Sequence, residues 1–243
     1  MDLDTTKTLA QLVNENPEFL MVFEKLRFRY DLAQDITIGE ALALRNLQMS
    51  DLMDCLEDCE REARFMDPKD LQVYDIPQLL GYIVFVHHGY MERELPRLEE
   101  NLHEAIRKDG PDHPELMELA PLFRNFREVL ELHMKEEERH LFPFFLFLAS
   151  PSQSHRFSLG GVVRLIEAFE DGDEEIESHL EQIRLKTRNY HVPLGAGKAT
   201  QDLFHHLSRM EFELRRHMNV ENNILFPKVT ALEREQTQVG LKN

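Results

Sequence analysis

Two segments of the chain carry the same spacing of histidine and glutamate: His133-Met134-x-x-Glu137-x-x-x-Leu141-Phe142-Pro143 and His217-Met218-x-x-Glu221-x-x-x-Leu225-Phe226-Pro227. Residues four apart lie on one face of an α-helix, so each imidazole and its carboxylate can reach a common ion. Two such helices facing each other would offer two histidines and two carboxylates to one pocket, and a carboxylate has two oxygens with which to bridge two metals. The repeat therefore predicts a dinuclear metal site inside a helical bundle.

Polar residues also interrupt the apolar stripes of the two remaining long helices. His88 takes a place on the stripe of the first helix, Asp173 does so on the third, and the two repeated pairs lie on the stripes of the second and fourth. Carboxylates buried without a partner cost several kcal/mol each, and a bound metal would offset that cost. The candidate metal ligands are His88, His133, Glu137, Asp173, His217 and Glu221.

Simpler interpretations of the single residues stay open. One histidine on an apolar stripe is more often a hydrogen-bonded core residue than a ligand, so His88 alone would not establish a site. Its neighbour His87 is expected to point away from the stripe. Asp173 follows Glu170-Asp171-Gly172, a run that could break the helix and face water.

The donor types indicate which metals the site would take. Carboxylate and imidazole groups suit iron or manganese better than a structural zinc, which prefers four closed ligands and often thiolates. Six ligands shared by two metals leave coordination positions open, where water, oxide, oxygen or nitric oxide could bind. We therefore expect two non-haem iron ions, with or without an oxo bridge, and manganese as the alternative.

The composition narrows the classes of function. The 243 residues carry a net charge of −17, which disfavours nucleic acid and anionic membranes as partners and attracts cations. The sequence contains neither an apolar run long enough to span a bilayer nor a secretory signal, so we expect the cytoplasm. The spacing of Cys55 and Cys59 would allow a thiol site, although the favoured interpretation is that both are ordinary small side chains, buried or half-buried. Phosphate-binding glycine loops and nucleophile elbows are lacking, which argues against a hydrolase.

Long 3.6-residue periodicities and few strand signals predict an all-α chain. We expect a small helical N-terminal domain of residues 1–65, a linker of residues 66–75, an up-down-up-down four-helix bundle of residues 76–231 and a C-terminal tail of residues 232–243. The bundle helices are predicted at residues 76–108, 114–145, 159–189 and 198–231.

Particular residues are predicted to begin or interrupt helices. The candidate caps of the short N-terminal helices are Thr8, Asn16 with Pro17, Thr37 and Ser50. Proline disrupts a helix interior, so Pro96 and Pro121 are expected to kink or interrupt their helices. Each Leu-Phe-Pro is expected to bend or end its helix, because the residue before proline disfavours α geometry.

On these residues the sequence resembles the hemerythrin-like di-iron proteins, and more closely the family called repair of iron centres, the iron-sulfur cluster repair di-iron proteins. The resemblance covers nearly the whole chain. It rests on His87-His88-x-x-x-x-Glu94-Leu95-Pro96, His133-x-x-x-Glu137-Glu138 with Leu141-Phe142-Pro143, His217-x-x-x-Glu221-Asn222-Asn223-Ile224-Leu225-Phe226-Pro227, Leu9-Ala10-x-Leu12-Val13-x-x-x-Pro17 and Val22-Phe23-Glu24-Lys25-Leu26.

The resemblance implies a non-haem di-iron centre on four histidines and two bridging glutamates. Its implied role is the recovery of iron-sulfur proteins after nitrosative or oxidative stress. Carried over residue by residue, His88, His133 and His217 match histidine ligands, and Glu137 and Glu221 match the bridging carboxylates.

The chain departs from the family at three places. Asp173 stands where the family has a third-helix histidine, and Glu170 takes that place if the alignment shifts. The family's paired cysteines are Asp31 and Leu32 here, and a cysteine before the last helix is Gly197. An aspartate in place of histidine adds a negative charge to the site and is a harder ligand. It therefore favours ferric iron and makes manganese a candidate metal.

Three functions follow from these expectations. The first is a di-iron protein of stress response that binds nitric oxide or oxygen, or donates iron to damaged iron-sulfur proteins. The second is a gas or redox sensor without enzymatic activity, and the third is a diverged scaffold with an incomplete metal site. The oligomeric state, monomer or homodimer, stays open.

Overall fold

The computed structural model describes residues 3–15, 19–28, 35–65, 70–150 and 161–240. In these ranges the chain is helical, and its β-type pairing is the isolated bridge between Thr8 and Thr37. The all-α prediction is therefore confirmed. None of the helices in this part of the chain is long and apolar enough to cross a membrane.

Two compact units divide the chain. The first comprises Met1–Val86, Glu136–Leu165 and Asn223–Asn243, and the second comprises His87–Lys135 and Ile166–Asn222. Because the long helices run through both units, each unit is built from segments that are distant in sequence.

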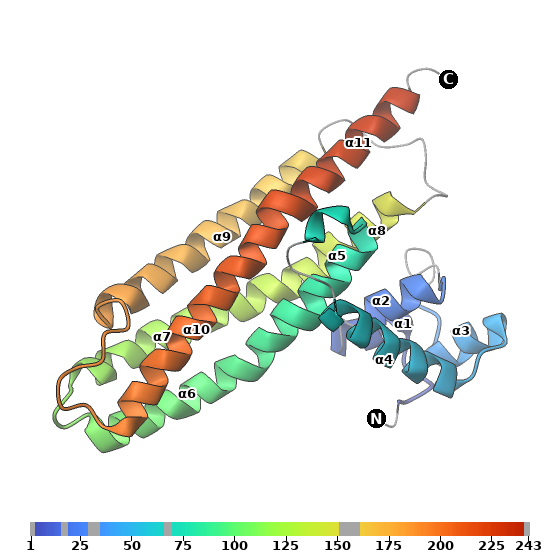
Figure 1. Ribbon diagram of the computed structural model, residues 1–243. Coiled ribbons are helices and arrows are strands. Elements are labelled where there is room, and N and C mark those ends of the chain that lie inside the picture. Colours follow the sequence, from blue (N-terminus) through green and yellow to red (C-terminus); the bar gives the residue numbers. More distant parts are fainter. Residues whose placement is uncertain (1–2, 16–18, 29–34, 66–69, 151–160, 241–243) are drawn as a thin grey trace. The chain divides into compact units, whose positions relative to one another are not determined.

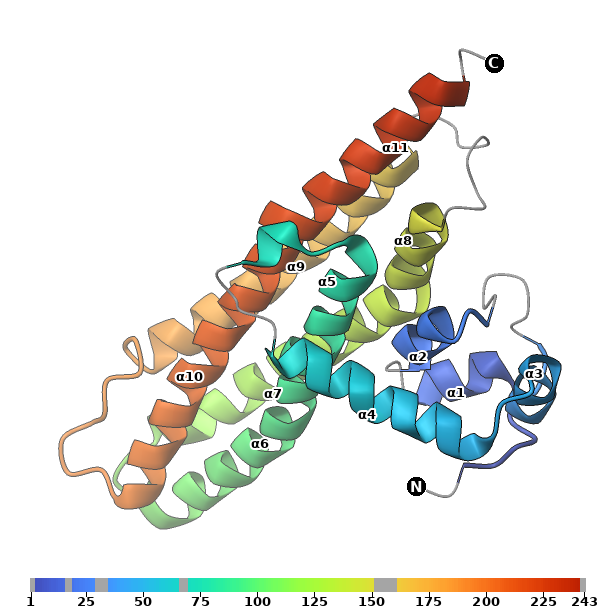
Figure 2. The same ribbon diagram turned by 45° about the vertical axis from the view of Figure 1, so that its right-hand side comes forward.

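The first unit begins with four short helices, shown from two sides in Figures 1 and 2. They are α1 (Leu9–Glu15), α2 (Phe19–Lys25), α3 (Ile38–Arg45) and α4 (Met49–Phe65). A 3₁₀ turn, Leu71–Val73, and three further helices complete the unit: α5 (Ile76–Tyr82), α8 (Phe142–Ala149) and α11 (Phe226–Gly240). Its core contains the stacked rings of Phe19 and Phe23, and the edge-to-face pair of Phe145 and Phe226.

Capping residues set the starts of these short helices. The Thr37 hydroxyl accepts the Glu40 N–H at the start of α3, and the Glu40 carboxylate accepts the Thr37 N–H in return. Thr8 makes the same reciprocal pair with Gln11, so both predicted caps are confirmed. Ser50 was the wrong cap, because α4 already begins at Met49. The predicted Asn16-Pro17 cap, Asp31 and Leu32 lie outside the described residues.

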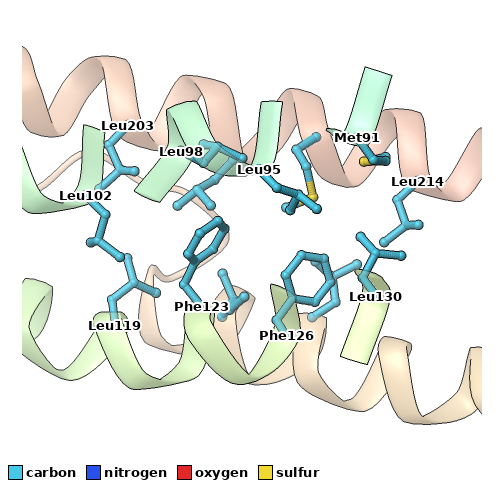
Figure 3. Close-up of a cluster of buried hydrophobic side chains, with 14 of the residues drawn as sticks. Met91, Leu95, Leu98, Leu102, Leu119, Phe123, Phe126, Leu130, Leu203 and Leu214 are labelled. Atoms are coloured by element: carbon cyan, nitrogen blue, oxygen red, sulfur yellow. The ribbon is translucent and has the colours of Figure 1, made fainter. Parts of the chain in front are cut away.

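The second unit is a bundle of four helices that alternate in direction (Figure 1). They are α6 (Gly89–Asp109), α7 (Glu115–Glu136), α9 (Gly161–Lys186, from Ile166 onward) and α10 (Lys198–Val220). All four contribute to one apolar core. In Figure 3 the rings of Phe123 and Phe126 point from α7 toward leucines of α6 and α10. The predicted four-helix bundle is confirmed.

Pro96 and Pro121 do not interrupt their helices, whereas the expected kink stays a prediction. Pro96 and Pro121 lie inside α6 and α7, which continue through them. Both prolines are exposed, so water can satisfy the carbonyl groups that lose their helical partners. The neighbours Leu95 and Leu119 are fully or almost fully buried and hold each helix on the core.

In the part of the chain that the structure describes, π-helical segments lie within the long helical runs at Ile83–His88, Glu137–Leu141 and Glu221–Leu225. The Phe142 N–H donates to the Glu137 carbonyl, five residues earlier. Pro143 and Pro227 then occupy the second position of α8 and α11, where a helix tolerates proline. The Leu-Phe-Pro motifs therefore do not end the helical run, and the expected bend stays a prediction.

The start of α10 depends on a side chain from α6. Gly197 occupies the N-cap position and offers no side chain, whereas the Asp109 carboxylate accepts a 2.6 Å hydrogen bond from the Thr200 hydroxyl. This hydrogen bond, helped by the N–H groups of Thr200 and Gly197, lowers the pKa of Asp109. Asp109 thus acts as the cap of α10.

We expect Asp109→Ala to lower the free energy of unfolding by about 1 kcal/mol at neutral pH, as the loss of a helix cap does. Since the folded state lowers this pKa, the contribution is present above the ordinary carboxyl pKa and disappears as the pH falls through the lowered value. Urea unfolding between pH 7 and pH ~2 measures both effects. The exposed Asp112→Ala is the control, and a pH-independent difference would contradict the assignment.

Candidate metal centre

Three of the predicted ligands converge from the turn that precedes α6 and from the end of α10 with the residue that follows it. The Nε2 atoms of His88 and His217 are 3.1 Å apart, and His217 Nε2 is also 3.1 Å from Glu221 Oε2. These side chains are at most 1% exposed, and their ligand atoms lie within 4.8 Å of one another. The group presents two imidazole nitrogens and a carboxylate oxygen to one point.

A second group joins α7, α9 and the same glutamate. His133 Nε2 is 3.2 Å from Asp173 Oδ1, and the ligand atoms of His133, Asp173 and Glu221 lie within 4.8 Å of one another. Asp173 is 7% exposed. Glu221 belongs to both groups, so its carboxylate lies where it could bridge two metals.

The backbone of α9 is fitted to His133. A Cβ atom on Gly172 would lie 2.8 Å from His133 Nδ1, so the ring occupies space that any other residue would fill. The His133 ring also meets the Phe169 ring edge-to-face, with 6.1 Å between centroids. α9 continues unbroken through this turn, which contradicts the interpretation that Glu170-Asp171-Gly172 breaks the helix. Glu170 is exposed, whereas Asp173 is buried.

Glu137 is placed by the helical run that carries His133. It lies four residues beyond His133, opens the π segment after α7 and is 1% exposed. Five of the six predicted ligands thus come together in the second unit, and the sixth lies just beyond it along the same helical run.

The π segments at Glu137–Leu141 and Glu221–Leu225 keep one face of each helical run buried beyond its ligand pair. Residues four apart on an α-helix are offset by about 40°, so a row of four-residue steps would drift around the helix. A π turn holds one residue more and cancels part of this drift. Two rows of such steps are buried throughout: His133, Glu137, Leu141, Phe145 and His217, Glu221, Leu225, Val229.

Sequence reasoning missed three residues at the site. His87 was expected to point away, but it is 1% exposed and its ring centroid lies 5.7 Å from that of His217. Burial, together with the nearby His217, lowers the pKa of His87 to about 2, so this imidazole is neutral. Asn222 donates a 3.0 Å hydrogen bond to Asp173 Oδ2, and Gly172 makes room for His133. The Asn222-Asn223 that follows Glu221 was the available signal for Asn222.

The donor set fits a metal. Two imidazole nitrogens 3.1 Å apart can place only one proton between them, and a carboxylate oxygen approaches one of the same nitrogens. Buried carboxylates need a compensating positive charge. A cation placed among these groups would accept the lone pairs of the imidazole nitrogens and the carboxylate oxygen that converge there.

A four-helix bundle that gathers buried imidazole and carboxylate groups at one level defines a metal-binding helical protein. The chain belongs to the hemerythrin family, because the hemerythrin HHE cation binding domain matches residues 81–229.

Relatives extend the similarity over most of the chain. An iron-sulfur cluster repair protein ScdA of Staphylococcus haemolyticus is 27% identical over 90% of this chain and 96% of its own length. An iron-sulfur cluster repair protein YtfE of Citrobacter koseri is 24% identical over 93% of this chain and 97% of its own length. Another YtfE, of Cronobacter sakazakii, is 29% identical over 68% of this chain and 71% of its own length.

Proposed function

We propose that this chain is a non-haem di-iron protein that helps to repair iron-sulfur clusters damaged by nitrosative or oxidative stress. The observation that carries the proposal is the pair of donor groups joined by Glu221. The similarity to the iron-sulfur cluster repair proteins ScdA and YtfE supports the repair role. The proposed setting is the cytoplasm, with iron-sulfur proteins as clients.

The proposed ligands divide between two metal positions. His88 and His217 hold one metal, His133 and Asp173 hold the other, and Glu221 bridges them. Glu137 is proposed as the second bridging carboxylate, because it repeats the His-x-x-x-Glu spacing and is buried. Asp173, not the exposed Glu170, is the proposed third-helix ligand. When bound, two irons would supply one-electron redox chemistry and open positions for nitric oxide or oxygen.

Two of the groups that border this site are uncharged. The Phe169 ring meets the His133 ring edge-to-face, and the neutral His87 adds no charge beside His217. This arrangement suits a small uncharged ligand such as nitric oxide.

Elemental analysis of protein from iron-replete cells tests the metal centre. About two irons per chain are expected, as in other carboxylate-bridged bundles, and His217→Ala should reduce this strongly. His206→Ala is the control, since the half-buried His206 pairs with Asn101 of α6 and is not among the proposed ligands. Iron well below one per chain would refute the di-iron proposal.

A repair assay tests the role separately. A dehydratase whose cluster has been damaged by nitric oxide should recover activity with the loaded protein and not with the His217→Ala variant. Equal recovery with free ferrous iron at the same concentration would contradict a specific repair function.

A further inference from the structure

We propose that the two metal positions are not equivalent, and that the position between His133 and Asp173 discriminates less against manganese(II), the harder cation, relative to iron(II) than its neighbour does. This inference rests on the dinuclear centre proposed above. It adds which cation each position prefers.

The donors supplied by the second unit are unequal. One position has two imidazole nitrogens, from His88 and His217, whereas the other has one imidazole from His133 and a carboxylate oxygen from Asp173. Glu221 serves both groups, so it does not offset the difference. Among the donors of the second unit, the position at Asp173 therefore has one imidazole fewer and one carboxylate more than its neighbour.

Asn222 holds Asp173 in this role. Its amide donates to Oδ2 at 3.0 Å, while Oδ1 lies 3.2 Å from His133 Nε2. One carboxylate oxygen is thereby engaged by the protein and the other is directed to the metal position. Asn222 directly follows Glu221, so one turn of the chain fixes both the shared carboxylate and the orientation of Asp173. Asn222 is a positioning residue.

The chemistry of the donors gives the direction of selectivity. Affinity rises from manganese(II) to iron(II) at most sites, and imidazole increases that preference, whereas carboxylate oxygen suits manganese. Replacing one imidazole by a carboxylate therefore reduces the penalty for manganese at this position. Manganese(II) supplied alone should fill the Asp173 position first.

Titration of metal-free protein with manganese(II) under anaerobic conditions tests the inference. The electron paramagnetic resonance signal of free aqueous manganese(II) reports binding. We expect one ion to bind at least ~10-fold more tightly than a second, a difference of the size that changes around metal ligands produce. An equimolar mixture of manganese(II) and iron(II) should load both metals onto the same chain, measured by elemental analysis.

Matched variants identify the residues responsible. Asp173→His should weaken the first manganese(II) by about 10-fold or more and raise the ratio of iron to manganese taken from the mixture. Asp173→Asn keeps the shape and tests the charge. Asp171→Asn removes the same charge from an exposed position two residues away. It should change neither the affinity for the first manganese(II) ion nor the ratio of iron to manganese taken from the mixture. Asn222→Ala should broaden the bound manganese signal and weaken binding less, and Asn222→Gln should partly restore both.

Several results would overturn the inference. Two manganese(II) ions bound with equal affinity would show equivalent positions, and unaltered selectivity in a folded Asp173→His or Asp173→Asn would remove Asp173 from the mechanism. Binding of iron but not manganese would refute the proposed preference while leaving the di-iron centre intact. Failure to bind either metal would refute the metal centre and this inference together.

Discussion

Glu221→Gln is expected to leave the chain folded but without metal at either position. Glutamine has the same shape as glutamate, but its neutral amide cannot bridge two cations as a carboxylate does. Because Glu221 belongs to both donor groups, its loss should empty both positions. Elemental analysis should fall from about two metals per chain to nearly none.

Thermal unfolding provides a second measurement, in which Glu221→Gln is expected not to lower the stability of the metal-free protein although it abolishes metal binding. Glu221 is 0% exposed, so removing its charge relieves a desolvation cost in the metal-free protein. The metal-free variant should be at least as stable as the metal-free parent. Metal should raise the Tm of the parent only, since a ligand stabilises the state that binds it.

The control for this experiment is Glu235→Gln, which changes an exposed carboxylate of α11. It should match the parent in metal content and Tm. Retention of one full metal equivalent by Glu221→Gln would mean that this carboxylate serves a single position.

Gly172→Ala is expected to stabilise α9 and, at the same time, to weaken metal binding. Alanine favours a helix interior over glycine by up to ~1 kcal/mol, so α9 itself should gain stability. The added Cβ would lie 2.8 Å from His133 Nδ1, closer than such atoms pack, so the imidazole must move away from Asp173. We expect metal affinity at that position to fall by about 10- to 100-fold.

Metal titration and urea unfolding of the metal-free variant measure the two effects of Gly172→Ala. Gly161→Ala on the same helix is the matched control, because its Cβ would lie 3.8 Å from the nearest atom, an ordinary contact. Parent-like metal affinity in Gly172→Ala would show that His133 tolerates displacement and contributes little to the site.

The sequence predicted the bundle and the burial of the candidate ligands because both depend on the same periodicity. An apolar stripe fixes which face of a helix is buried, so a histidine or carboxylate on that stripe must also be buried. The six candidates are 0 to 9% exposed, in agreement with this reasoning. The duplicated His-x-x-x-Glu made the two most informative helices recognisable without structural information.

The residues that the sequence did not predict depend on backbone geometry. Gly172 was interpreted as a potential helix break, because nothing in the sequence shows that an imidazole from another helix needs its space. His87 appeared one residue off the buried stripe, yet it lies in the π segment Ile83–His88, where a regular 3.6-residue count no longer gives the facing direction. The prolines misled for a related reason: the structure places them on exposed faces or just after widened turns.

The π segments also make the long helical runs tolerant of a change in chain length. Each turn with i→i+5 bonding contains one residue more than an α turn. Deleting one residue after Glu137 within Glu137–Leu141 would leave an ordinary α turn in its place. A π turn and an α turn both close about one full rotation, so the buried face beyond the deletion would stay nearly in line with His133 and Glu137, which precede it. A one-residue gap at these positions in an alignment of related chains is therefore compatible with the same arrangement of ligands.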